Sequence, residues 1–202
     1  MLKRTKHCSQ NQAENINLNR IHLRQAQSVV LRGGIIAYPT EGVYGLGCLP
    51  YLGEAVQQIL DLKRRSVDKG FILVAASSEQ LLPYVVFPDK ETQDRVLATW
   101  PGPVTWVLPA GKNVPFWITG KYESVAARVS NHPVIQGICN RTGVIISTSA
   151  NPETCPPARD ARKVRFYFNN YVDYVYPGNV GRLSGPTEIR DAMTGDILRE
   201  VH

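Results

Sequence analysis

The segment 63–70, with the sequence KRRSVDKG, places four cations within eight residues. Residues 53–62 before it have the apolar spacing of an amphipathic helix, and the apolar run 71–76 after it is typical of a buried strand. Two regular elements therefore hold the cations in place, and connections of this kind often carry function. Cations also complement the dipole at a helix C-terminus, but Lys69 lies beyond the expected turn. We interpret the segment as an anion-binding site, with helix capping as the alternative.

Two further motifs place hydroxyl groups at the ends of predicted strands. The first, YPTEGVYGLG at 38–47, offers Thr40 and Tyr44 as hydrogen-bonding groups, and its glycines permit close backbone approach to a ligand. A tight structural loop with Tyr44 in the core is an equally supported interpretation. The second motif, STSAN at 147–151, supplies donors and acceptors that can cradle a phosphate. An N-cap cluster is the weaker interpretation here, because prolines keep the following chain extended.

Single residues add to this chemistry. Arg128 interrupts the apolar strand 124–130, as an edge residue or as an anion ligand that faces a cleft. Thr105 follows a Pro-Gly-Pro turn, whereas Arg159 and Arg182 are each more typical of solvated charges. Neither a GxSxG elbow nor an HExxH motif is present in the sequence. A site rich in cations and hydroxyls but poor in general bases favours catalysis by positioning and electrostatics, as in phosphoryl and nucleotidyl transfer.

The elements that must hold these groups alternate irregularly between short helices and short strands. This order predicts an α/β (α+β) fold, a three-layer single domain with a mixed, twisted open sheet. Residues 39–50 are predicted as a loop. The predicted helices are 18–32, 53–62, 79–85, 89–100, 132–141 and 158–169, and the predicted strands are 35–38, 71–76, 104–109, 124–130, 144–148, 172–176, 188–191 and 197–201.

Length and composition set the class of protein. The chain has 202 residues and a net charge of +6, which suits one domain with nucleotide or nucleic-acid partners. We divide it into a flexible N-terminal extension, 1–17, and a domain, 18–202. The four cysteines show no metal-ligand spacing, so we expect reduced thiols and a cytoplasmic location. We expect no membrane partner, because no apolar window is long enough to span a bilayer.

Taken together, the motifs resemble the YrdC family in its short bacterial, TsaC-type form, from about residue 18 to 202. The motifs are YPTEGVYGLG, K-x-R-x-x-x-K at 63–69, PGP-x-T at 101–105, ARV at 127–129 and STSAN at 147–151. The resemblance implies a YrdC-like fold with a basic concave cleft. It also implies a nucleotidyltransferase, a threonylcarbamoyl-AMP synthase, that forms threonylcarbamoyl-adenylate and pyrophosphate from L-threonine, bicarbonate and ATP with Mg²⁺. The product would serve the t6A modification of adenosine 37 in tRNA.

The resemblance also carries roles over to matching positions. Threonine or its carbamate would be bound by Thr40, Tyr44, Lys69, Arg128, Ser147 and Thr148. ATP would be bound by Lys63, Arg65, Thr105, Ser149, Asn151, Arg159 and Arg182. No catalytic group and no protein metal ligand is assigned, because Mg²⁺ is expected to be held through the ATP phosphates. The implied partners are tRNA and the t6A-pathway proteins TsaB, TsaD and TsaE. The family often continues Ser-Ala-Asn with one residue and then Ser-Gly, whereas this chain has PETC at 152–155.

Two other functions use the same residues. A non-catalytic module that binds double-stranded RNA or tRNA would use the cations for phosphate contacts. Hydroxyl-rich strand ends and a tight glycine loop suit a small ligand better than a duplex. The second alternative is carbamoyl-adenylate chemistry with another acceptor, as in larger proteins that embed this domain, but this chain shows no accessory domain.

Overall fold

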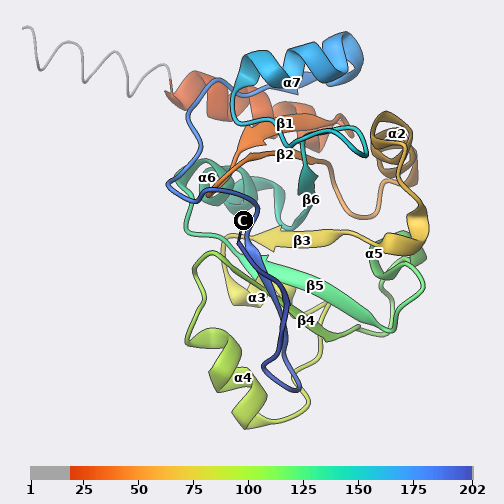
Figure 1. Ribbon diagram of the computed structural model, residues 1–202, viewed down its shortest axis with the longest axis vertical. Helices are drawn as coiled ribbons and strands as arrows, with labels where there is room; N and C mark the ends of the chain where they lie inside the picture. The colour runs from red at the N-terminus through yellow and green to blue at the C-terminus, as the bar shows by residue number, and fades with distance from the viewer. Residues whose placement is uncertain (1–18, 202) are drawn as a thin grey trace, which may run out of the picture.

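The computed structural model describes residues 19–201, which form a mixed nine-stranded sheet with helices on both faces (Figure 1). The strand order is β7-β1-β2-β6-β3-β5-β4-β8-β9. Three neighbouring pairs, β1 with β7, β3 with β5 and β4 with β8, are parallel, and the others are antiparallel. The predicted α/β fold with a mixed, twisted sheet is confirmed. The predictions for 1–18, including the flexible extension, and for His202 lie outside the described residues.

The elements are short, and most lie where the sequence predicts them. Residues 19–31 are helical, and no helix within 19–201 is both long and apolar enough to cross a membrane. The strands are β1 (Ile36–Pro39), β2 (Tyr44–Gly47), β3 (Ile72–Ala75), β4 (Val104–Pro109), β5 (Ser124–Val129), β6 (Ile145–Ser149), β7 (Tyr174–Val175), β8 (Glu188–Asp191) and β9 (Ile197–Arg199). The helices are α2 (Gly53–Lys63), α3 (Ser78–Leu81), α4 (Lys90–Leu97), α5 (Phe116–Thr119), α6 (Pro133–Thr142) and α7 (Ala161–Phe168), with 3-10 turns η1 (Val67–Lys69) and η2 (Asn169–Tyr171).

Two differences from the prediction have physical reasons, and a third is a short helix that the sequence analysis missed. The predicted loop 39–50 is wrong in part, because it contains β2, whose two glycines hide the strand signal and whose pairing with β1 and β6 supplies the order. The short helix α5 was not predicted. Helix α7 begins at Ala161 rather than at residue 158, because the Asp160 side chain accepts a hydrogen bond from the Lys163 N–H and caps the helix there.

The two faces of the sheet are packed against different helices. Ile36, Tyr38 and Val74 point to one face and pack with buried residues of α6 and of the helix 19–31. Their neighbours in the strands, such as Ala37 and Leu73, point to the other face and pack with α2, α4 and α7. This alternation is the side-chain period of a strand. The cleft described below lies on the same face, over β8, β4 and β5 and the adjoining parts of β3 and β6.

A late segment of the chain, 177–187, crosses the loop between β1 and β2. The N–H of Gly181 donates to the Thr40 carbonyl at 2.8 Å, and the N–H of Leu183 donates to the Glu41 carbonyl at 3.0 Å. The backbones approach so closely that a Cβ at Gly42 would lie 2.0 Å from the Gly185 carbonyl oxygen, so only glycine fits there. The crossing fixes the β1–β2 loop against the residues that lead into β8.

Candidate active site

A cleft of about 510 Å³ opens on the uncovered part of the sheet. Its floor is one row of register partners across five strands: Ser147 (β6), Ile72 (β3), Ala126 (β5), Val107 (β4) and Asp191 (β8). Register partners project from the same face of a sheet, so the row forms a continuous surface. Sites for small molecules have volumes of roughly 300–1,000 Å³, and this cleft falls within that range.

The walls of the cleft are cationic. Arg65, Lys69, Arg128 and Arg199 line it, and among the described lining residues Asp191 alone carries a carboxylate. The Asp191 Oδ1 accepts hydrogen bonds from the N–H groups of two following residues, at 2.7 and 3.3 Å, and therefore shapes the β8–β9 turn. The cleft consequently favours anionic ligands. The basic cleft expected from the sequence is present.

The cleft brings together eight of the thirteen residues that the resemblance singled out. The predicted residues that line it are Thr40, Tyr44, Arg65, Lys69, Arg128, Ser147, Thr148 and Ser149. The predicted residues that are absent from its lining are Lys63, Thr105, Asn151, Arg159 and Arg182. Sequence reasoning missed Tyr122, Thr187 and Arg199, which also line the cleft. Thr187 could have been found, because it lies in a Pro-Thr-Glu-Ile-Arg-Asp run beside a predicted strand.

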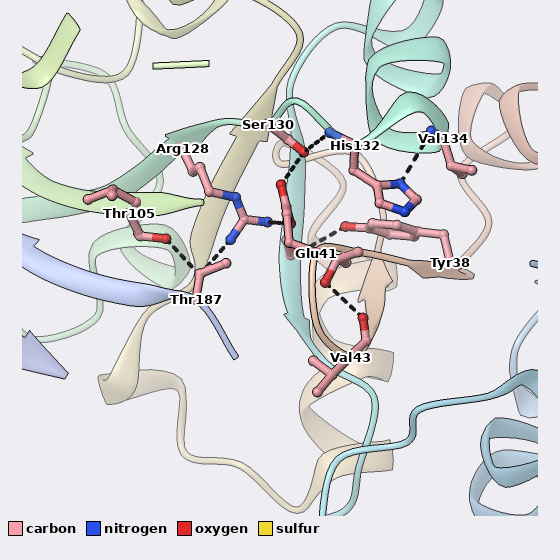
Figure 2. A network of polar contacts seen from close by, with 12 residues as sticks. Tyr38, Glu41, Val43, Thr105, Arg128, Ser130, His132, Val134 and Thr187 are labelled. Carbon is pink, nitrogen blue, oxygen red and sulfur yellow. Dashed lines mark hydrogen bonds and ion pairs between the residues drawn. The ribbon is translucent and has the colours of Figure 1, made fainter. Parts of the chain in front are cut away.

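A buried polar network surrounds Arg128 (Figure 2). Its Nη2 lies 3.1 Å from the Glu41 Oε2, and its Nη1 donates to the Thr187 Oγ1 at 2.6 Å. The other carboxylate oxygen of Glu41 accepts a hydrogen bond from the Ser130 hydroxyl at 2.5 Å. The Thr105 hydroxyl, fully buried, lies 3.1 Å from that of Thr187. Thr105 therefore supports the cleft from beneath, through Thr187.

The hydroxyls of the glycine-rich motif are held by the protein itself. Thr40 donates to the Val43 carbonyl at 2.7 Å, and Tyr44 donates to the Gly178 carbonyl at 2.6 Å. The Tyr44 side chain is fully buried, and burial raises the pKa of its phenol to about 12. The interpretation of Tyr44 as a core residue is therefore the better description of its ring. The Tyr38 hydroxyl donates to the Ser147 Oγ at 2.9 Å, which leaves the Ser147 hydroxyl hydrogen available to the cleft.

Lys63 is buried at the end of α2, with 4% of its surface exposed. Its ammonium donates to the Asn151 carbonyl at 2.7 Å and also to the carbonyl of Ser149. Burial, assisted by the nearby Arg65, lowers the pKa of Lys63 to about 8. Lys63 thus ties α2 to the end of β6 and acts on the cleft through the strand that it holds.

The other arginines of the set also brace backbone. Arg65 donates to the Gly70 carbonyl at 2.9 Å, and its guanidinium lies 5.6 Å from the centroid of the Phe71 ring, so it stabilises the turn that presents Lys69. Arg159 donates to the Leu183 carbonyl at 3.1 Å and to the next carbonyl but lies outside the lining. Arg159 therefore holds the segment 177–187 in place. Arg182, on that segment, is exposed.

The loop after β6 departs from the family pattern and is nevertheless ordered. The Asn151 side-chain amide donates to the carbonyls of Pro152 and Cys155, at 3.0 and 2.8 Å. The Glu153 N–H donates to the Lys63 carbonyl at 2.8 Å, and the Glu153 carboxylate forms an ion pair with the ammonium of Lys69. The proposed phosphate loop and the basic segment are therefore joined by both backbone and side chain.

Thr154 takes a left-handed backbone conformation, with φ of +71°. This conformation costs an L-residue about 1–2 kcal/mol, and a β-branched side chain makes it a true outlier. We expect Thr154→Gly to raise the free energy of unfolding by up to about 1 kcal/mol, because glycine removes the strain but adds some entropy to the unfolded chain. Urea unfolding followed by circular dichroism measures the change.

A control for this substitution is Thr142→Gly, at the end of helix α6. Thr142 has a negative φ, so glycine there relieves no strain and is expected to lower stability by about 1 kcal/mol. A loss of stability in both variants would contradict the strain assigned to Thr154.

Comparison with known proteins agrees with the fold. The family model Sua5_yciO_yrdC, described as telomere recombination, matches residues 28–200. Threonylcarbamoyl-AMP synthase of Nitrosococcus oceani is 48% identical over 178 residues, which cover 88% of this chain and 96% of the relative. The corresponding protein of Coxiella burnetii is 47% identical, with the same two coverages.

Solved structures give the same result. P. abyssi Sua5 complexed with L-threonine superposes with a TM-score of 0.81 at 30% identity, over 88% of this chain and 53% of that one. This chain therefore spans about half the length of P. abyssi Sua5. E. coli YciO superposes with a TM-score of 0.77 at 25% identity, over 91% of this chain and 90% of that one. The extent of these matches, over sequence and fold alike, places the chain in the Sua5/YciO/YrdC family.

Proposed function

We propose that this protein is a threonylcarbamoyl-AMP synthase, a nucleotidyltransferase that joins L-threonine, bicarbonate and ATP and releases pyrophosphate. The observation that carries the proposal is the cleft, whose size suits small molecules and whose walls hold four cations above a polar strand end. The relatives that bear this enzyme's name match the chain over nearly their whole length. P. abyssi Sua5 has been solved with L-threonine, which makes an amino acid the expected ligand of this cleft as well.

The cleft suits each step of this reaction. The threonine amine attacks the bicarbonate carbon, and loss of water gives a carbamate. A carbamate oxygen then attacks the α-phosphorus of ATP, the bond to the β-phosphate oxygen breaks, and pyrophosphate leaves with the bonding electrons. All the substrates are anionic or carry a carboxylate, and negative charge on the phosphate oxygens is stabilised by cations held in place. We assign the threonine carboxylate to Arg128 and Ser147, the carbamate to Lys69, and the phosphates to Arg65.

The remaining requirements of the reaction are proposals. Mg²⁺ would enter bound to the phosphates of ATP, and we assign it no protein ligand. Bicarbonate would bind within the same cationic cleft. We also propose a cytoplasmic location, transfer of the product to TsaB, TsaD and TsaE, and contact with tRNA, all of which rest on the family resemblance. A purely RNA-binding role is disfavoured, because the relatives are named as enzymes and the cleft has the volume of a small-molecule site.

Pyrophosphate release from ATP, with bicarbonate and Mg²⁺, tests the proposed function. We expect release that requires L-threonine and is not supported by L-serine at equal concentration. Arg65→Ala is expected to reduce release by roughly 100-fold or more, because it removes a cation from the developing phosphate charge. Lys112→Ala, at an exposed lysine outside the cleft lining, is the matched control and should release pyrophosphate at the wild-type rate. Release independent of any amino acid would overturn the proposal.

A further inference from the structure

We infer that Glu41 is a positioning residue, which acts through Arg128 on the binding of the amino-acid carboxylate. The inference rests on the proposed function, because it takes the carboxylate of threonine as the ligand of Arg128. Glu41 belongs to the β1–β2 loop, and Arg128 projects from β5 on the same face as its register partner Val74. Arg128 therefore lies where the helix-covered part of the sheet meets the cleft.

The burial of this ion pair calls for an explanation beyond stability. The side chains of Glu41 and Arg128 are 7% and 5% exposed. Removing two charges from water costs several kcal/mol per ion, and well-packed apolar residues often stabilise a fold equally well. A buried pair is therefore weak evidence of a stabilising role. Burial also lowers the pKa of His132, a base close enough to interact with the charge of Glu41, so Arg128 is the cation that balances Glu41.

The two anchors of Arg128 define the plane of its guanidinium. Glu41 contacts Nη2 at 3.1 Å, and Thr187 accepts from Nη1 at 2.6 Å, so the two terminal nitrogens are held from different segments of the chain (Figure 2). Each terminal nitrogen carries two N–H groups. Thr187 takes one N–H of Nη1, whereas the contact of Nη2 with Glu41 is an ion pair in which the Glu41 Oε2 accepts no hydrogen bond. Nη1 and Nη2 therefore each keep at least one N–H group, and a carboxylate is bound best by two such groups in one plane.

Glu41 is itself held on several sides. Its Oε1 accepts from the Ser130 hydroxyl at 2.5 Å, and the Ser130 Oγ accepts in turn from the His132 N–H at 3.1 Å. Its backbone carbonyl accepts from the Leu183 N–H at 3.0 Å. The carboxylate therefore cannot rotate without breaking its contacts with Arg128 and Ser130. A rigid carboxylate beside a guanidinium sets the direction of the remaining N–H groups.

This role predicts a selective effect on threonine. Loosening either anchor of Arg128 should raise the KM for L-threonine about tenfold. The KM for ATP should change by less than about twofold. A tenfold change in affinity corresponds to about 1.4 kcal/mol of binding free energy. The variants are Glu41→Gln and Thr187→Val, and Thr187→Ser should rescue the second because it restores the hydroxyl. Glu188→Gln is the control, since Glu188 pairs with Arg190 and lies outside the cleft lining. The shift in Tm produced by L-threonine provides a readout independent of turnover.

A double-mutant cycle shows whether Glu41 acts through Arg128. Arg128→Lys alone should raise the KM for threonine, and adding Glu41→Gln should raise it little further, because the positioned group is already lost. Additive effects would overturn the inference, as would an unchanged KM in both Glu41→Gln and Thr187→Val. If the wild-type protein releases no pyrophosphate, the proposed function fails, and the Tm shift alone decides. The positioning role would then be overturned if L-threonine shifted the Tm of wild type and Thr187→Val equally, or shifted the Tm of neither.

Discussion

Replacing Arg128 by methionine is expected to lower the free energy of unfolding by about 3–5 kcal/mol, because Glu41 would then be buried without a counter-charge. Adding Glu41→Gln to Arg128→Met removes the second charge and should recover most of that loss. Pyrophosphate release should remain at least roughly 100-fold below wild type in both variants, because neither retains the guanidinium. Urea unfolding and the threonine-dependent release assay measure the two effects separately.

This pair of variants distinguishes a structural from a functional ion pair. If the double variant is as unstable as Arg128→Met, the loss comes from packing around the arginine stem rather than from an unpaired carboxylate. If the double variant regains activity along with stability, the guanidinium is not needed for substrate binding. The expected pattern is a stable protein with almost no activity.

Replacing Lys63 by methionine is expected to change how stability depends on pH. Burial lowers the pKa of Lys63 from 10.5 to about 8. Between these values the unfolded chain binds a proton that the folded protein does not, so the stability contributed by this site rises with pH and is lost as pH falls through about 8. A shift of this size corresponds to about 3 kcal/mol over the window. Lys63→Met lacks this rise.

The measurement is the difference in unfolding free energy between wild type and Lys63→Met, taken from about pH 7 to about pH 10.5. The difference cancels other groups that titrate in this window. Burial raises the pKa of the Cys48 and Cys139 thiols from 9 to about 12, so they lower the stability of both proteins alike as the pH rises. Parallel pH profiles for the two proteins would contradict the burial of an ionisable amine at this position.

Most elements of the fold could be predicted because their local pattern agrees with their tertiary role. The helix that ends at Lys63 and the strand 124–129 have clear apolar periods, and both were found within one or two residues of their ends. Strand β2 could not be predicted, because its glycines have no β propensity of their own. A Cβ at Gly47 would lie 2.5 Å from the Ile146 carbonyl oxygen. Glycine is therefore needed there to let β6 approach closely, and this requirement is tertiary, so the local sequence does not indicate a strand.

The positive charge of the site could be predicted from the sequence, but the ion pairs and hydrogen bonds between its residues could not. Arg128 is the one cation in the apolar strand 124–130, so its sequence context marks it as unusual. Lys63 precedes two other basic residues, and the sequence does not indicate which of the three is buried. Glu41 lies 87 residues before Arg128 in the chain, and nothing in the sequence around either residue indicates that their side chains meet. Motif reading finds groups that could bind a ligand, and only packing shows which of them reach the cleft and which hold the others.

The crossing of 177–187 over the β1–β2 loop has a consequence for synthesis of the protein. Thr40 and Glu41 leave the ribosome early, but Gly181 and Thr187, which fix that loop and Arg128, are translated only after all strands from β1 to β7. A nascent chain can therefore form its early helices and hairpin while its cleft still lacks one wall. We expect that substrates cannot bind to the growing chain, and that L-threonine or ATP stabilises the protein only after β8 has joined the sheet.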